Sequence, residues 1–562
     1  MQDQLEALKK TFGGNKKVKL AKLLQQISRR RYKDALSLIR LHESLLFMLA
    51  YPQNEALLKG AMKILASFPA RIKYLKKINA DLTPFETPEM AGIASIALTT
   101  MPGYNFARWI SMYHANNVEI DWQYCEEEER LGATLPRILP LLEEEALVES
   151  HLPFTNYIQV AKKNTTDLAW LMKNFSRLPI SEKQKAELFE SLKLFIRFTP
   201  DFDSSRTGLK LARMEIFYHD TPLIQRSGIS IQDELGAPAL KINKLPVKKG
   251  KGILDIIRTA SVVRYRELHG FIWADPKSFI EVEAGRGVTV YINEVLPENR
   301  LPLRAYHSGF IFKNGIPVGY IEGLSLFEKM EVGFNLYYTF REGETAWLYI
   351  KLLRIFKQLL GVTVFAVDPY QVGHGNEEGI QSGAFWFYRK LGFYPVLDGV
   401  AKMVEKEEKK MVSPAYRTPA SLLRKMATSY LYYLYERTPG HPVSIQNPWK
   451  DFQIRNILLS LQKKMSQKFN GDPARMKEAA GQLLSRSLNI KTNNWPAFER
   501  ESFNYMAIIL SGMRGISKWS NEEKKSLIQI IRAKGGSGEA HYLFLMQNHP
   551  RLREIIIGLG CD

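Results

Sequence analysis

Cysteine is scarce in this chain: Cys125 and Cys561 are the two cysteines among 562 residues. Two cysteines allow at most one disulfide, which excludes a disulfide-rich secreted scaffold. Long apolar runs are missing too, because the apolar stretch 91–98 falls short of the roughly 18 to 20 residues of a membrane span. The stretch 1–6 is acidic and polar and lacks the basic and apolar regions of a signal peptide. We therefore expect a cytoplasmic location and no membrane span.

Acidic residues are outnumbered, since 58 Asp and Glu face 78 Lys and Arg and leave a net charge of +20. Such an excess favours contact with phosphates, whether of a nucleic acid, an anionic lipid or a coenzyme. The basic residues cluster at 16–19, 29–31 and 244–251. No zinc-ligand spacing, aromatic RNA-binding strand motif or basic zipper accompanies them. Nucleic-acid contact through the basic surface therefore stays open as one alternative.

No fixed-period repeat is visible, and the length predicts three or four globular domains. Apolar residues recur at helical spacing up to about residue 194, which predicts helices over 34–49, 54–68, 135–149 and 181–198. Beyond residue 419 the sequence is helical again. Helix starts are expected there at Pro419, at Pro473 and at the capping box formed by Ser520 and Glu523.

Changes in composition predict the domain boundaries. Strand-like pieces such as 212–218 and a flexible basic linker at 246–252 precede the central part. The charged stretch 402–410 and the proline-containing stretch 413–419 follow it, and the tyrosines of 430–435 are expected to pack on a helix. The expected division is an N-terminal helical domain (1–199), a mixed connecting segment (200–249), a central α/β domain (250–402), a linker (403–418) and a C-terminal helical domain (419–562).

The central part has an order of elements that bears on function. A hairpin with an Asn-Gly turn over 308–323 leads to a strand over 330–339 and then to a glycine-containing turn. A helix over 344–360, a β-branched strand over 361–367 and a short helix over 384–391 follow. A strand that ends in a glycine turn and opens a helix leaves free N–H groups at the positive end of the helix dipole, which suits a phosphate.

This order, together with Gln381-Ser-Gly-Ala-Phe-Trp-Phe-Tyr-Arg-Lys-Leu-Gly-Phe393, resembles the GNAT acyltransferase superfamily over roughly 250–402. The resemblance implies an α/β domain with a mixed central sheet and flanking helices, here between two mainly α-helical domains. It also implies acetyl-CoA or another acyl-CoA as co-substrate. The residues expected to hold the coenzyme are Arg341, Gly343, Glu344, Thr345, Ala346 and Gln381. The turn has one glycine, and the carboxylate of Glu344 stands where phosphates would lie, which departs from the family pattern.

The resemblance implies that Tyr388 protonates the leaving thiolate. Acyl transfer to an amine also needs a base, and Glu331 and Glu322 on the central strands are the candidates. Alternation along the strand places Glu331 and Asn335 on one face. The loop after the strand 361–367 supplies further polar residues that could contact a basic acceptor. These are His374, Asn376, Glu377 and Glu378; they lack the spacing of a metal site, so no metal is expected.

The expected function is transfer of an acyl group from acyl-CoA to an amine whose identity the sequence does not encode. One alternative is a Fem-type transferase that takes activated amino acids from tRNA, which the positive charge and the altered turn favour. A second alternative is a module with a degenerate GNAT fold that senses an acyl-CoA without turning it over.

Overall fold

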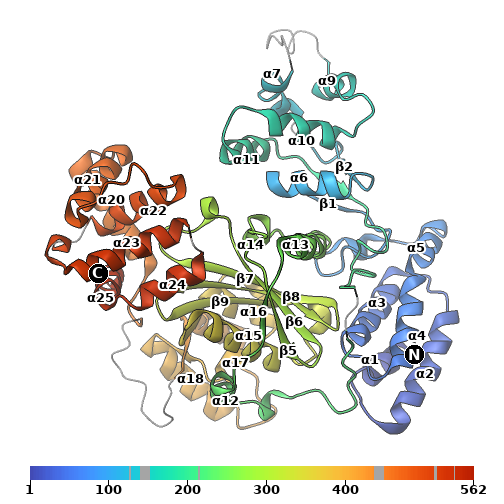
Figure 1. Cartoon of the computed structure of the whole chain (residues 1–562). Coiled ribbons are helices and arrows are strands. Elements are labelled where there is room, and N and C mark those ends of the chain that lie inside the picture. Colours follow the sequence, from blue (N-terminus) through green and yellow to red (C-terminus); the bar gives the residue numbers. More distant parts are fainter. Residues whose placement is uncertain are drawn as a thin grey trace.

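The computed structural model describes residues 1–125, 128–139, 152–212, 215–435, 449–511, 515–536 and 538–561. A nine-stranded mixed sheet forms its centre, and helical lobes lie on either side of it (Figure 1). We call them the N lobe (1–94) and the C lobe (449–561), and a third, the small-sheet lobe (98–198), projects away from the central sheet. The expectation of a mixed α/β protein with helices flanking a large sheet is confirmed. No helix in these ranges is long and apolar enough to cross a bilayer.

The central sheet has the order β11-β12-β10-β9-β8-β7-β6-β5-β4. The pair β9 and β10 is parallel and all other neighbours are antiparallel. The predicted hairpin is confirmed, with Asn314 and Gly315 at positive φ in its turn. The strands are β4 (Ile242–Lys244), β5 (Ile280–Gly285), β6 (Val288–Glu294), β7 (Ala305–Lys313), β8 (Ile316–Leu326), β9 (Lys329–Leu336), β10 (Val364–Val367), β11 (Tyr394–Pro395) and β12 (Leu431–Leu434).

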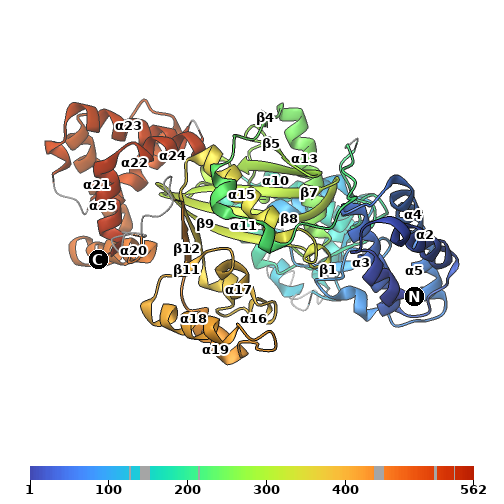
Figure 2. The same ribbon diagram turned by 90° about the horizontal axis from the view of Figure 1, so that it is seen from below.

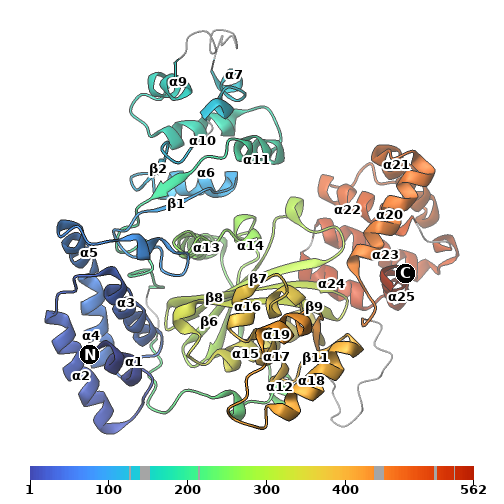
Figure 3. The ribbon, with the colours of Figure 1, turned by 180° about the vertical axis from the view of Figure 1, so that it is seen from behind.

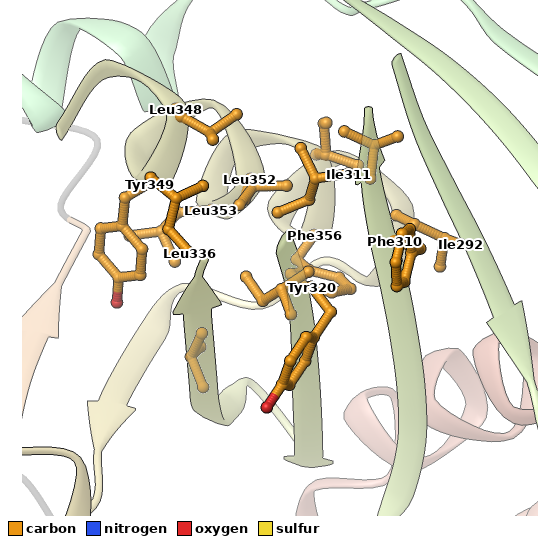
Figure 4. Packing of buried hydrophobic residues seen from close by; sticks show 14 of the residues in the cluster. Ile292, Phe310, Ile311, Tyr320, Leu336, Leu348, Tyr349, Leu352, Leu353 and Phe356 are labelled. Carbon is orange, nitrogen blue, oxygen red and sulfur yellow. The ribbon is translucent and has the colours of Figure 1, made fainter. Parts of the chain in front are cut away.

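Helices cover both faces of this sheet, with α13 and α14 on one side and α15 to α17 on the other (Figures 1 and 3). Figure 4 shows Leu348, Leu352 and Phe356 of α15 packed over the strands. The predicted helix 344–360 is thus confirmed, and Gly361 ends it at a φ of 67°. The helices are α12 (Ile231–Gly236), α13 (Val247–Val262), α14 (His269–Ile272), α15 (Thr345–Leu360), α16 (Glu377–Gln381), α17 (Ala384–Arg389), α18 (Asp398–Lys410) and α19 (Ala420–Met426).

The N lobe is helical, as expected. Asp34 and Asn54 cap the helices that the patterns over 34–49 and 54–68 predict, and their side chains accept hydrogen bonds from Ser37 N–H and Leu57 N–H. α3 is buried on nearly all sides because it lies between the other helices of the N lobe and the central sheet (Figure 2). The helices are α1 (Gln2–Leu8), α2 (Gly14–Arg29), α3 (Ala35–Ala50), α4 (Glu55–Ala66) and α5 (Phe68–Lys77).

The small-sheet lobe corrects one expectation. The helix predicted over 181–198 begins at its capping box but ends at Ser191, and 196–198 forms a strand because Ile196 and Phe198 face the core of a three-stranded sheet. Most of the predicted helix 135–149 lies outside the described residues. The elements are β1 (Leu98–Thr100), α6 (Tyr104–Tyr113), β2 (Val118–Ile120), α7 (Leu135–Ile138), α9 (Phe154–Ala161), α10 (Asp167–Arg177), α11 (Glu182–Ser191) and β3 (Ile196–Phe198).

The connecting segment corrects two further expectations, the strand-like piece over 212–218 and the flexible linker over 246–252. In the described part of 212–218, residues 215–218 are irregular, because Phe217 N–H donates to the side chain of Asn314 instead of a neighbouring strand. The stretch 246–252 is not a flexible linker. Pro246 stands at the N-cap of α13, a position that proline tolerates, and the lysines form the first turns of the helix.

The region after residue 402 also differs from expectation. The charged stretch 402–410 belongs to α18. Of the tyrosines of 430–435, Tyr432 and Tyr433 lie on β12, a short strand between β10 and β11, and Tyr430 and Tyr435 flank it, so none lies on a helix. The predicted caps at Asp472 and Ser520 are confirmed. The C lobe consists of α20 (Ile454–Phe469), α21 (Pro473–Leu488), α22 (Ala497–Leu510), α23 (Asn521–Gly535), α24 (Glu539–Gln547) and α25 (Pro550–Cys561).

A buried carboxylate joins the N lobe to the sheet. Glu43 on α3 accepts hydrogen bonds from Arg206 (2.7 Å) and His42 Nδ1 (2.9 Å), and a third from Thr339 just after β9. His42 Nε2 accepts from the Thr207 hydroxyl at 3.0 Å, which fixes one tautomer for the neutral ring. Burial alone would raise the pKa of Glu43, but the Arg206 charge and these hydrogen bonds outweigh it and lower the pKa to about 2.

We expect Glu43→Gln to lower the free energy of unfolding by about 3 kcal/mol at pH 7, because Arg206 would remain buried without a counterion. Since the folded-state pKa lies below the usual 4.5, the carboxylate stabilises above about pH 4.5 and that contribution is lost as the pH falls toward 2. Urea unfolding followed by circular dichroism should therefore show a wild-type advantage that shrinks between pH 5 and pH 2. An advantage that is constant over this range would contradict the assignment.

Candidate functional site

The central sheet opens between β9 and β10. β9 pairs with β8 over 329–336, but its parallel pairing with β10 covers only 329–331. β10 ends because Asp368 and Pro369 turn the chain into a short 3-10 helix (Pro369–Val372), and the Asp368 side chain accepts from Tyr370 N–H at 2.8 Å. Among the described residues, no strand therefore pairs with the second half of β9 on its β10 side.

This opening leaves backbone groups of β9 free to meet a ligand. Tyr337 N–H donates to the Val318 carbonyl of β8, and hydrogen bonds alternate along an antiparallel pair. The last parallel pair, Glu331 with Ala366, uses the N–H of Val332. The C=O of Val332 and both backbone groups of Phe334 consequently point away from β8 into the opening. Such groups bind extended ligands that carry amides, much as an added strand does.

A cavity of about 400 Å³ occupies the opening and is lined from both faces of the sheet. Tyr320 and Glu322 of β8 lie opposite Asn335 and Gly333 of β9 and share one face with them. Phe387 and Tyr388 of α17 come from the other face, where α15 packs. The lining residues are Arg266, Tyr320, Glu322, Gly333, Phe334, Asn335, Leu336, Arg341, Thr345, Tyr370, Gln371, Asn376, Glu378, Gly379, Ser382, Ala384, Phe387 and Tyr388.

The structure brings together seven of the residues singled out in the sequence, and they come from β8, β9, α15, α16, α17 and the turn before α15. Gly383 stands before α17 at a φ of 67°, and Tyr388 packs edge-on against Tyr349 of α15 with ring centroids 5.4 Å apart. Asn376 caps α16 by accepting from Gly379 N–H at 3.2 Å. The seven are Glu322, Asn335, Arg341, Thr345, Asn376, Glu378 and Tyr388.

Tyr388 and Glu322 are the reactive groups of the cavity. Burial raises the pKa of the Tyr388 hydroxyl above its ordinary value, so the phenol is protonated at neutral pH and can act only as a proton donor. Glu322 accepts a hydrogen bond from the buried Tyr306 hydroxyl, which holds the carboxylate in place. Asn335 Nδ2 donates to the Tyr320 hydroxyl at 3.1 Å beside it. An acid and a carboxylate thus line one cavity from opposite faces of the sheet.

The first turn of α15 forms the third wall. Thr345 lines the cavity as the first residue of this 16-residue helix, and no side chain caps the helix. Arg341 stands next to it, with Nε donating to the Leu336 carbonyl at 3.0 Å and Nη2 pairing with Glu378 at 2.6 Å. A guanidinium and uncapped helical N–H groups side by side favour an anion.

Gly343 and Glu344 face away from the cavity. A Cβ at Gly343 would lie 2.3 Å from the Tyr51 hydroxyl of the N lobe, so this glycine permits contact between the turn and α3. The Glu344 carboxylate is buried and accepts hydrogen bonds from Arg286 Nε (3.1 Å), Lys313 Nζ (3.3 Å) and Ile224 N–H (3.1 Å). Its charge is therefore neutralised by the β5–β6 turn and the end of β7, and it does not occupy the place of a phosphate.

Other residues named from the sequence also lie outside the cavity. Glu331 lies 3.8 Å from Arg304 beside Lys329, and burial raises the pKa of Glu331. Glu377 pairs with Arg424 of α19 at 2.9 Å. The rest do not line the cavity either: His374 and Gln381 are exposed, and Ala346 is a buried residue in the first turn of α15.

Tyr320, Gln371 and Arg266 are among the lining residues that the sequence reasoning missed. Tyr320 stands two positions before Glu322, so alternation along β8 could have found it. Gln371 and Arg266 carry no such signal. α13 ends at Val262, and the turn that follows this helix carries Arg266 to the cavity.

Within the described ranges, no group of three or more His, Cys, Asp or Glu residues could hold a metal ion. Comparison with protein-family models, with curated proteins and with solved structures gave no match.

Substitution of Glu344 tests its structural assignment. Glu344→Gln should lower the free energy of unfolding by about 3 to 5 kcal/mol, because Lys313 and Arg286 would lose their buried counterion. Glu342→Gln is the matched control: Glu342 is exposed and its ion pairs with Lys9 and Lys10 are worth about 0 to 1 kcal/mol. Thermal and urea unfolding would measure both variants. Equal stability of the two variants would contradict the assignment.

Proposed function

We propose that the protein is an N-acyltransferase of GNAT type, which moves an acyl group from acyl-CoA to an amine. The observation that carries the proposal is the cavity in the opened sheet, which joins Tyr388 on one face to Glu322 on the other. A reaction between a large donor and a separate acceptor needs such a passage, because the two substrates must approach the reacting carbon from different sides.

The donor side of the cavity supports coenzyme binding. Arg341 and the N-terminus of α15 offer positive charge for a pyrophosphate. The free C=O of Val332 and the free N–H and C=O of Phe334 can hydrogen-bond the amides of the pantetheine arm. Turning Glu344 toward Lys313 removes the like charge that would otherwise repel phosphates.

The acceptor side supports the chemistry. Glu322 takes a proton from the amine, directly or through water, and the neutral nitrogen attacks the thioester carbonyl. A β9 N–H in the opening stabilises the oxyanion, the C–S bond breaks, and Tyr388 gives its proton to the departing thiolate. The nitrogen loses its extra proton as the amide forms, and that proton restores the Tyr388 phenol. A new amide and free coenzyme A result. Glu322 takes this role in place of Glu331, which lies outside the cavity.

A pair of variants at Thr345 tests the coenzyme site. Thr345→Glu adds a carboxylate at the first position of α15, where the helix dipole favours it, so folding should be preserved. The same carboxylate should repel a pyrophosphate and weaken acetyl-CoA binding at least tenfold in calorimetry, whereas Thr345→Gln should bind nearly as wild type. Equal affinity of the Glu and Gln variants would place the coenzyme elsewhere.

A pair of tyrosine variants tests the acid. Tyr388→Phe should lower kcat by about 10²-fold or more with little change in acetyl-CoA affinity, since general acid catalysis contributes about 10² to 10⁴. Tyr349→Phe is the control, because the Tyr349 ring packs against Tyr388 but does not line the cavity. Release of coenzyme A in the presence of an amine panel is the readout. A wild-type rate for Tyr388→Phe would refute its assignment.

A further inference from the structure

The N lobe carries a share of the positive charge far above its size. Residues 1–94 hold 17 Lys and Arg against 8 Asp and Glu, in a chain whose net charge is +20. The N lobe is about one sixth of the chain and supplies nearly half of its net positive charge. The acyl-transfer proposal uses none of these residues.

The charge is ordered along one face of α2. Leu20, Leu23, Leu24 and Ile27 are buried against the rest of the lobe. Lys19, Lys22 and Arg29 are exposed and follow the spacing i, i+3, i+10, which places them on the opposite side of the helix over a rise of about 15 Å. α2 therefore presents a cationic stripe to solvent.

The end of α2 and the start of α5 extend the stripe as one rigid surface. Arg71 of α5 donates to the carbonyls of Arg30 (2.7 Å) and Ser28 (3.1 Å). The Arg30 guanidinium lies over the Tyr32 ring at 5.4 Å and that of Arg31 over the Tyr74 ring at 5.7 Å. Stacked guanidinium planes keep their N–H edges free for phosphate oxygens.

We define the basic face by Lys19, Lys22, Arg29, Arg30, Arg31 and Lys73, which are all exposed. In the described part of the chain none of the six forms an ion pair with a carboxylate, although other cations of the lobe do, such as Arg40 with Asp3 and Lys59 with Glu55. A row of cations without acidic partners destabilises the folded state because the charges repel one another. A bound polyanion would relieve that repulsion.

We infer that the basic face binds the phosphodiester backbone of a nucleic acid. A lipid surface fits less well, because an interfacial helix needs an exposed apolar face. Val18 is the one large apolar side chain that α2 exposes, and burial of one valine yields only about 1.5 kcal/mol. The contacts are to phosphates and carry no base readout, so affinity should depend on salt far more than on sequence.

Fluorescence anisotropy of the full chain with labelled duplex DNA, duplex RNA and single-stranded RNA of 20 nucleotides tests this inference. Wild type should bind at 50 mM salt, with affinity falling steeply toward 200 mM. The triple variant Lys19→Gln, Lys22→Gln, Arg29→Gln should bind duplex DNA at least tenfold more weakly, and its salt slope should fall by about 3. Comparison of the three labelled probes distinguishes DNA from RNA, and binding to either kind of nucleic acid supports the inference.

The matched control removes the same charge elsewhere: Lys248→Gln, Lys249→Gln, Lys251→Gln on α13, where the lysines are also exposed. This variant should keep the wild-type affinity and the wild-type salt slope. An equal loss in both triple variants would overturn the assignment to the basic face. Absence of wild-type binding at 50 mM salt, or tighter binding to phosphatidylglycerol vesicles than to any nucleic acid, would overturn the inference itself. Acyl transfer is not measured, so failure here leaves the proposed function standing.

Discussion

The ion cluster of Glu344 with Lys313 and Arg286 is the interaction on which the arrangement of the site depends. A carboxylate as buried as this one costs several kcal/mol unless it is paired, so its partners fix where the turn after β9 can lie. The turn after β9 is therefore held next to the β5–β6 and β7–β8 turns. On the N-lobe side, Glu344 N–H donates a hydrogen bond to the Tyr51 hydroxyl. As a result α15 begins with its uncapped N–H groups beside the opening in the sheet, and the Glu344 carboxylate is turned away from the cavity.

The opening follows from a mismatch between two neighbouring strands. β9 continues to pair with β8 for eight residues, while β10 turns away at Asp368 and Pro369. The sheet therefore loses a strand partner where β9 carries Gly333 and Asn335. α17 and the loop 368–376 border the opening, and side chains from two faces meet in it. The N lobe stabilises this geometry, because Glu43 of α3 accepts a hydrogen bond from the Thr339 hydroxyl shortly after the end of β9.

Much of the central fold could be predicted because its signals are local. Asn314 and Gly315 specify the hairpin, the spacing of α15 and Gly361 specify that helix, and the closing motif predicts α17 with Tyr388. Non-local contacts account for the failures. β12 is four residues long and becomes a strand only because β10 and β11, distant in sequence, flank it. The partners of Glu344 lie 31 and 58 residues away, so the sequence indicated a conflict with phosphate that the fold removes.

Hydrogen–deuterium exchange across β9, with and without saturating acetyl-CoA, tests the central claim most directly. A coenzyme that occupies the opening will hydrogen-bond the free backbone of Phe334, and exchange of the Phe334 amide should slow on binding. The amides that already pair with β8, such as Tyr337 N–H to Val318, should change little. Unchanged exchange at Phe334 under conditions where acetyl-CoA is bound would contradict a ligand site in the opened sheet.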